Sequence, residues 1–169
     1  MRMSLAGKTL AGCTAAAILA ALSSIVAGRG VEAPVQPIQF SHRVHAGENR
    51  LACLYCHAGA DRSAAAGVPA VETCYECHRT VKAKNGEIAK VFDSWQRKQP
   101  IRWTRVYSLP QHVYFSHKRH VLAGVACETC HGAVAEADTI ARVSPLTMGW
   151  CVDCHEQRRA PTGCETCHK

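Results

Sequence analysis

Cysteine and histidine recur in one fixed pattern, Cys-x-x-Cys-His, which the sequence contains five times. Two thiols at this spacing can form thioether bonds with the two vinyl groups of one haem, while the adjacent imidazole binds its iron. Each copy is therefore predicted to attach one c-type haem. The thioether cysteines would be Cys53, Cys56, Cys74, Cys77, Cys127, Cys130, Cys151, Cys154, Cys164 and Cys167, and the proximal ligands His57, His78, His131, His155 and His168.

Paired cysteines at this spacing also form zinc sites and disulfides, which are the alternative interpretations. Histidine occupies 10 of the 169 positions, so a His directly after all five pairs would arise by chance roughly once in a million. The motifs use every cysteine of the chain except Cys13. We therefore favour five haem c groups over zinc or disulfides.

Five further histidines can supply the second axial ligands of five irons. These predicted distal ligands are His42, His45, His112, His117 and His120. Four of them form two His-x-x-His pairs, in which the two imidazoles cannot both face one iron, so each is predicted to serve a different haem. For the fifth iron the thioether of Met148 is the alternative to His112, and we place His112 first.

The order of these motifs indicates an internal duplication. Phe40–His45 (FSHRVH) recurs as Phe115–His120 (FSHKRH), and each copy is followed by two haem motifs. The sequence thus predicts a pentahaem domain over 40–169, with two-haem modules at 40–78 and 115–155 and a fifth haem at 164–168.

Between the modules, apolar residues at helical spacing predict an amphipathic helix over Asn85–Arg97, ended by Pro100. Residues 101–107 are predicted to form a strand or an extended crossing. Residues 58–70 and 132–146 are predicted loops, since Ala, Gly, Pro and Ser predominate there. Trp95, Trp103 and Trp150 are predicted to pack against haem.

The composition predicts a mostly helical and irregular fold whose core is formed by haem. Aromatic residues make up only 6% of the chain, so the protein alone would bury too little apolar surface. The formal charge of +7 becomes about −3 with the propionates of five haems. We attribute the basic excess to propionate pairing and expect no nucleic-acid partner, because no recognition motif accompanies it.

One basic stretch lies between the modules: Arg97, Lys98, Arg102 and Arg105. Its simplest interpretation is propionate pairing or a solvated face. The alternative is a surface that docks a partner protein.

Residues 1–28 are predicted to form an N-terminal membrane anchor. Thr9–Gly28 contains no charged residue, and about 20 such residues span a hydrocarbon core. Arg2 and Lys8 precede it, which places the N-terminus in the cytoplasm and the haem domain outside. A cleaved signal peptide is the alternative. Residues 29–39, which include two prolines, are predicted to be an extended linker.

Phe-Ser-His-x-x-His followed by paired haem motifs resembles the class III multihaem cytochromes c. Three stretches are also similar to the pentahaem subunit of alternative complex III: Pro37–His42 (PIQFSH), Leu109–His117 (LPQHVYFSH) and Pro145–Cys151 (PLTMGWC). This second resemblance extends over nearly the whole chain.

The resemblance implies a single-pass subunit of the bacterial inner membrane with its haem domain in the periplasm. Its implied neighbours are an iron–sulfur, molybdopterin-like subunit and integral membrane subunits that bind quinol. Electrons would pass from this quinol-oxidising complex to a cytochrome c or a terminal oxidase. The subunit itself would conduct electrons and would not be an enzyme.

Other functions remain as alternatives. One is a stand-alone membrane-anchored enzyme, either a quinol dehydrogenase or a terminal reductase, and another is a free periplasmic carrier. A reductase needs one five-coordinate haem, whereas this chain offers six candidate ligands for five irons. The duplicated Phe-Ser-His-x-x-His favours the relay over the quinol dehydrogenase.

Overall fold

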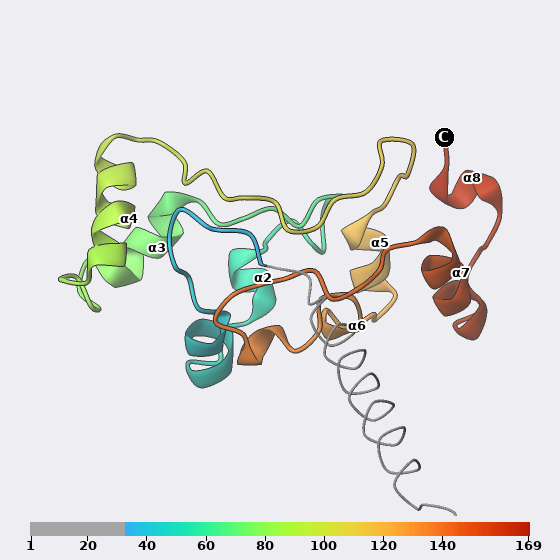
Figure 1. Cartoon of the computed structure of the whole chain (residues 1–169), viewed down its shortest axis with the longest axis horizontal. Coiled ribbons are helices and arrows are strands. Elements are labelled where there is room, and N and C mark those ends of the chain that lie inside the picture. Colours follow the sequence, from blue (N-terminus) through green and yellow to red (C-terminus); the bar gives the residue numbers. More distant parts are fainter. Residues whose placement is uncertain (1–32) are drawn as a thin grey trace, which may run out of the picture. The chain divides into compact units, whose positions relative to one another are not determined.

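Short helices joined by long irregular segments make up the fold (Figure 1). The computed structural model describes residues 33–169, which form one unit. Its elements are η2 (Arg43–Glu48, a π-helix), α2 (Cys53–Cys56), α3 (Val71–His78), α4 (Gly86–Gln96), α5 (His117–Leu122), α6 (Glu128–His131), η3 (Val134–Glu136, a 3-10 helix), α7 (Met148–Gln157) and α8 (Cys164–Cys167). Residues 33–169 contain no strand, and an isolated bridge pairs Val113 with His168. The predicted helical and irregular class is confirmed.

The cysteine motifs determine where five of these helices lie. Helices α3 and α7 contain complete motifs, α2 and α8 run from the first to the second cysteine, and α6 begins directly after Cys127. Positions i, i+3 and i+4 lie on one face of a helix. Helices α3 and α7, which contain the whole motif, can therefore present both thiols and the imidazole on the same side.

The predicted helix between the modules is confirmed as α4. The side chain of Asn85 caps it by accepting a hydrogen bond from the backbone nitrogen of Glu87, at 2.8 Å. On its apolar face, Trp95 stacks on Tyr75 of α3 with ring centroids 3.9 Å apart. The prediction that Pro100 ends the helix is wrong, since α4 already ends at Gln96.

The segments around α4 are irregular. Residues 101–107 form no strand, so the extended crossing is the form observed. Thr104 and Gln36 join two distant segments through two hydrogen bonds of 2.9 Å each. Residues 58–70 form turns and irregular chain as predicted, whereas the predicted loop at 132–146 contains η3. A single helical turn is too short to leave a periodic signal in the sequence.

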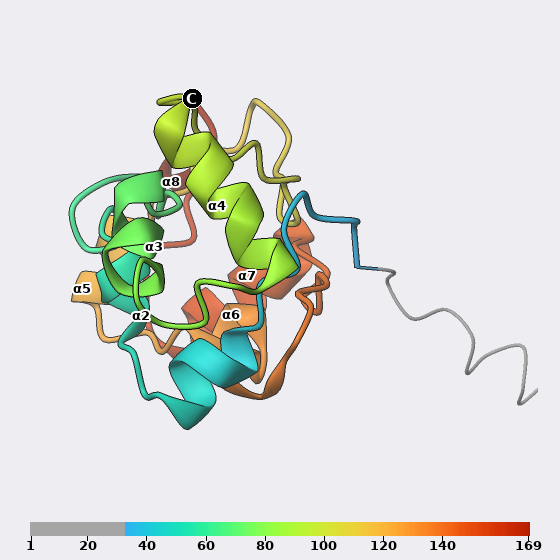
Figure 2. The same ribbon diagram turned by 90° about the vertical axis from the view of Figure 1, so that its left-hand side faces the viewer.

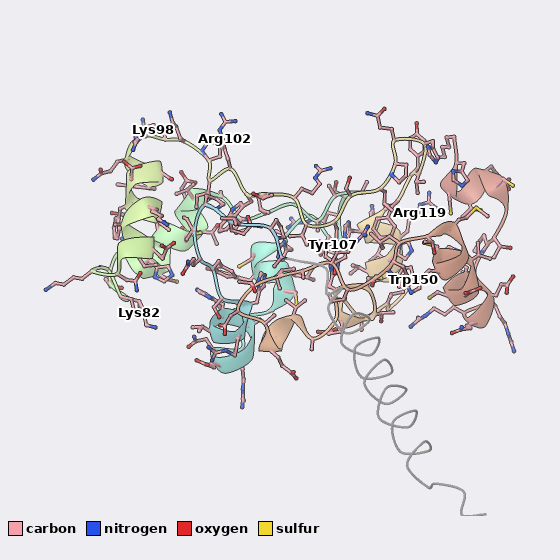
Figure 3. All side chains as sticks on the ribbon, viewed as in Figure 1. Lys82, Lys98, Arg102, Tyr107, Arg119 and Trp150 are labelled. Atoms are coloured by element: carbon pink, nitrogen blue, oxygen red, sulfur yellow. The ribbon has the colours of Figure 1, made fainter. Side chains whose placement is uncertain are left out.

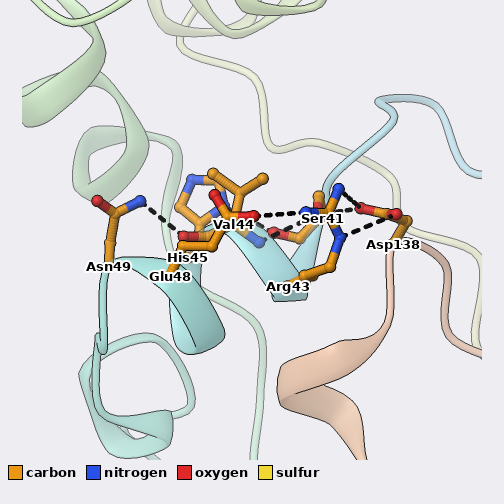
Figure 4. Close-up of polar contacts among 7 residues, drawn as sticks. All are labelled: Ser41, Arg43, Val44, His45, Glu48, Asn49 and Asp138. Carbon is orange, nitrogen blue, oxygen red and sulfur yellow. Dashed lines mark hydrogen bonds and ion pairs between the residues drawn. The ribbon is translucent and has the colours of Figure 1, made fainter.

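The first module packs against the second through η2 and η3. A Cβ atom on Gly47 would lie 2.3 Å from the carbonyl oxygen of Ala135, so only glycine permits this approach. Polar contacts extend the interface to Asp138, which accepts hydrogen bonds from the side chains of Ser41 and Arg43 (Figure 4).

The second module packs against the first in an equivalent way. The backbone nitrogens of His117 and Lys118, in α5, donate to the carbonyl oxygens of Ala64 and Ser63 at 3.0 Å each. Each Phe-Ser-His-x-x-His segment is thus held by backbone from a loop of the other module.

The apolar core of the polypeptide is very small. Between residues 33 and 169, the buried apolar side chains are Ile38, Ala60, Val71 and Val91. A soluble domain of this size ordinarily buries most of the surface of its unfolded chain. The small core is in keeping with cofactors that supply the missing apolar bulk.

None of the helices between residues 33 and 169 has the length and hydropathy to cross a membrane. The predicted anchor, residues 1–28, lies outside the described residues.

Candidate haem sites

Each of the five upstream histidines lies beside one motif histidine. The ring centroids are 6.5 Å apart for His42 and His57, 6.0 Å for His45 and His78, 6.4 Å for His117 and His131, 6.0 Å for His120 and His155, and 5.6 Å for His112 and His168. Two imidazoles on opposite sides of one metal, each bound at about 2 Å through a ring nitrogen, have centroids about 6 Å apart. The five pairs therefore match the separation that two axial ligands need.

Hydrogen bonds orient most of these rings. Nδ1 lies within hydrogen-bond distance of a backbone carbonyl oxygen in His45, His57, His78, His117, His120, His155 and His168, at 2.6–3.1 Å. A carbonyl oxygen only accepts, so the proton must lie on Nδ1. Nε2 is then free to bind a metal, as in most metal-binding histidines.

Burial favours the neutral form that metal binding requires in two further rings. The pKa of His42 is lowered to about 4, mainly by burial and also by the neighbouring His57 and His45. Burial likewise lowers the pKa of His131, with added contributions from His117 and His57.

The duplication seen in the sequence extends to the geometry of the aromatic rings. The Phe40 ring centroid lies 4.9 Å from that of His42 and 4.3 Å from that of His45. The corresponding distances from Phe115 to His117 and His120 are 4.8 Å and 4.5 Å. In each Phe-Ser-His-x-x-His segment, one phenyl ring thus lies close to both imidazoles.

We number the sites by the order of their motifs in the chain, so that site 2 is Cys74–His78. A cavity at site 2 is lined by Cys74, Cys77 and both imidazoles of the pair, His45 and His78. Most of its other lining residues are apolar, Trp103 among them. Its two thiols, two imidazoles and apolar walls fit one haem.

Two of the residues predicted at haem sites are exposed. Trp95 stacks on Tyr75 and is 37% exposed. Met148, the alternative fifth ligand, begins α7 and is 72% exposed. His112, in contrast, is paired with a motif ring.

Sites 2, 1 and 3 are neighbours in space. Burial raises the pKa of the Cys56 thiol of site 1, and the nearby thiols of Cys53 and Cys77 raise it further. Burial also raises the pKa of Cys127 at site 3. The charge of Cys53 and a hydrogen bond between the two thiols raise this pKa further. Site 1 therefore lies between site 2 and site 3.

Sites 3, 4 and 5 continue the series. Burial raises the pKa of Cys130, with further increases from Cys154 and Cys151 of site 4. Burial also raises the pKa of Cys151, and the nearby thiol of Cys167 at site 5 raises it further. The motif helices follow the same spatial order, α3, α2, α6, α7 and α8 (Figure 1). This order could not be predicted from the sequence, because five motifs of the same type do not indicate which of them are neighbours in space.

The two halves of the chain match two related families of multihaem cytochromes c. Residues 24–104 match the class III cytochrome c family, and residues 113–169 match cytochrome c7 and related cytochromes c. The chain is a class III-like multihaem cytochrome c. This multihaem cytochrome therefore carries c-type haem, and its function is electron transfer.

A relative of known function is the multihaem cytochrome c subunit of menaquinone reductase from Nitratidesulfovibrio vulgaris. It is 28% identical over 161 residues, which cover 79% of this multihaem cytochrome and 77% of the relative.

Proposed function

We propose that this multihaem cytochrome binds five haem c groups and acts as an electron-relay subunit of a quinone-linked membrane complex. The observation that carries the proposal is the set of five histidine pairs, one at each motif. The spatial series of sites 2, 1, 3, 4 and 5 supports it, because electron transfer between haems requires that they be neighbours.

Each of the candidate haem-binding residues has a defined role in this proposal. The ten motif cysteines hold the porphyrins by thioether bonds, and the motif histidines bind the irons as proximal ligands. His42, His45, His112, His117 and His120 occupy the opposite axial positions. When bound, each haem supplies a centre that can gain or lose one electron. With both axial positions filled by imidazole, no site remains for a substrate, so the chain is not itself an enzyme.

The resemblance to the pentahaem subunit of alternative complex III supports a specific setting. In it, residues 1–28 anchor the chain in the bacterial inner membrane and residues 29–39 link the anchor to a periplasmic domain. An iron–sulfur, molybdopterin-like subunit and quinol-binding membrane subunits supply electrons. A cytochrome c or a terminal oxidase receives them.

A second candidate is a relay that works in the opposite direction, towards quinone. It is supported by the relative, whose name describes a subunit of a menaquinone reductase. The same five sites would serve both directions, so the partners and their reduction potentials decide between them.

Purification of the tagged chain from native membranes, with its associated subunits, tests the relay. We expect a menaquinol analogue to reduce the haems in the complex, whereas the isolated chain should be reduced by dithionite and show no quinol:cytochrome c turnover. Sustained turnover by the isolated chain would contradict the relay and favour a stand-alone quinol dehydrogenase. Haems that quinol fails to reduce, but that reduce added menaquinone, would favour the second candidate.

A further inference from the structure

Four of the five predicted distal ligands have rings that their surroundings hold in place. The Nδ1 atoms of His45 and His120 each hydrogen-bond to a carbonyl oxygen four residues upstream, at 2.8 Å. Nδ1 of His117 bonds to a carbonyl oxygen of the first module at 2.9 Å. His42 is half-buried, and its ring packs edge-on against the phenyl ring of its segment, with centroids 4.9 Å apart. Each of these rings can leave an iron only by breaking a hydrogen bond or displacing packed neighbours.

His112, the predicted distal ligand of site 5, has neither kind of support for its ring. It is exposed in a turn, and its ring makes no hydrogen bond with any residue between 33 and 169. Its backbone, in contrast, is fixed. The carbonyl oxygen of His112 accepts a hydrogen bond from Nδ1 of His168 at 3.1 Å, and the backbone nitrogen of Tyr114 donates to the carbonyl oxygen of Cys167 at 2.7 Å. The imidazole of His112 can therefore rotate away from an iron while the chain around it stays in place.

The missing ring hydrogen bond should weaken the bond between His112 and iron. A hydrogen bond from the far nitrogen of a metal-bound imidazole orients the ring and increases its basicity, and loss of such a partner typically costs about 10–100-fold in metal affinity. The distal rings of sites 2, 3 and 4 all have this hydrogen bond. At site 1 the ring lacks it but is half-buried, which limits the access of a competing ligand. Site 5 thus combines a weakly held distal ring with open access.

Site 5 also lies at an end of the series of sites. Figure 1 shows α8 and the C-terminus at one end of the domain. Figure 3 labels Lys98 and Arg102 at the opposite end, where site 2 lies, and Figure 2 views that opposite end directly, with α4 in front. A small molecule can therefore reach the exposed ring of His112 from solvent without passing another candidate haem site.

We propose that His112 is an exchangeable ligand, and that a small uncharged diatomic molecule such as carbon monoxide or nitric oxide replaces it at site 5 when the haem there is reduced. The proposal rests on the proposed function, since it requires a haem at site 5. The incoming molecule forms a bond to iron as the bond from Nε2 of His112 breaks, no electron is transferred, and the freed imidazole remains neutral. Such molecules bind and stabilise ferrous haem, so the exchange would retain an electron at site 5 and block this end of the relay.

Binding of carbon monoxide to the reduced holo-protein tests the proposal. The full chain, purified in detergent with its haems, is reduced with dithionite and mixed with carbon monoxide, and haem absorbance is followed by stopped flow. The variant His112→Ala removes the proposed exchangeable ring. Its matched control is His45→Ala, which removes a hydrogen-bonded distal ring from site 2 at the opposite end of the series.

In the unchanged chain we expect carbon monoxide to bind about one haem in five. Its rate should reach a plateau as the concentration rises, because departure of the imidazole becomes limiting. His112→Ala should bind the same amount at least about tenfold faster and without a plateau. His45→Ala should add a second, fast phase and keep the slow phase of site 5. No binding by the unchanged chain, binding to two or more of its haems, or a slow phase that survives in His112→Ala would overturn the proposal.

Each variant must first show the haem content of the unchanged chain by mass. If His112→Ala does not, Cys164→Ala/Cys167→Ala, which removes the haem of site 5 alone, takes its place and should abolish carbon monoxide binding. Binding that persists in this variant would also overturn the proposal. The assay uses no quinone and no partner subunit. A chain with five haems that binds no carbon monoxide would therefore reject the exchange alone, whereas failure of quinol or quinone to react with the complex would reject the proposed function alone.

Discussion

An imidazole ring that donates Nδ1–H to a carbonyl group can bind iron only through Nε2, and this constraint recurs through the candidate sites. His45 and His120 use the same acceptor in each module, the carbonyl oxygen of Ser41 or Ser116, at 2.8 Å in both cases. The acceptor lies four residues upstream in each copy, so the local helical turn orients the distal ring. His168 at site 5 donates instead to the carbonyl of His112, its own partner in the pair, at 3.1 Å.

The fifth distal ligand gives a test at this scale. Because His112 lies beside His168 and Met148 is exposed, His112→Ala should convert one of five haems from low spin to high spin. Met148→Leu is the matched control and should leave the spectrum unchanged. Electron paramagnetic resonance of the oxidised protein measures both. A high-spin signal in the Met148 variant, with none in the His112 variant, would assign the methionine as the ligand.

Helices and loops position these rings through contacts between the modules rather than through a continuous core. The approach of η2 to η3 at Gly47 and the bonds of Ser41 and Arg43 to Asp138 hold the first His-x-x-His segment (Figure 4). These contacts also keep sites 1 and 3 adjacent. The interface between modules is therefore expected to be the most sensitive part of the fold outside the motifs.

Gly47→Ala tests that expectation. Its new methyl group would overlap the Ala135 carbonyl group, whose backbone position offers little room to move, and we expect a loss of about 1–3 kcal/mol in the free energy of unfolding. Gly149→Ala in α7 is the control, because nothing lies within 4 Å of the added carbon and alanine favours a helix. Urea unfolding followed by haem absorbance measures both. Equal stability of the two variants would show that the η2–η3 contact contributes little.

Sequence patterns predicted the structural features that depend on residues close together in the chain. The apolar spacing of Ile88, Val91, Phe92 and Trp95 predicted α4. The duplicated Phe-Ser-His-x-x-His indicated two related modules, and the phenyl–imidazole distances are similar in the two copies. Contacts such as those of Asp138 with Ser41 and Arg43 were not foreseen, because they join residues far apart in the chain. The spatial order of the sites depends on such contacts and was missed for the same reason.

At the scale of the whole molecule, the domain is a series of candidate haem sites with a very small polypeptide core. Charge is unevenly distributed along the chain, since residues 79–105 have a formal charge of +6 while the remaining described chain has −1. A relay of this kind needs a fixed position relative to its partners. The proposed anchor at residues 1–28 would provide that position at the membrane surface.

Membrane retention tests the anchor. About 20 uncharged residues behind a basic flank should keep the chain in the membrane through a high-salt wash, because salt weakens charge pairs and leaves apolar burial intact. Immunoblotting of pellet and supernatant measures this, and N-terminal sequencing of the mature chain provides the control. A mature chain that begins after Ala27 or Ala33 and appears in the soluble fraction would favour the free periplasmic carrier.

The central claim is that five haems are covalently bound, one at each paired-histidine site, and the intact mass of the native protein tests it most directly. Thioether bonds survive denaturation, so mass spectrometry under denaturing conditions counts the attached haems without loss. We expect the mass of the polypeptide plus five haems, and of the polypeptide plus four haems for Cys127→Ala/Cys130→Ala. A native chain that carries only two or three haems would contradict the five-site relay.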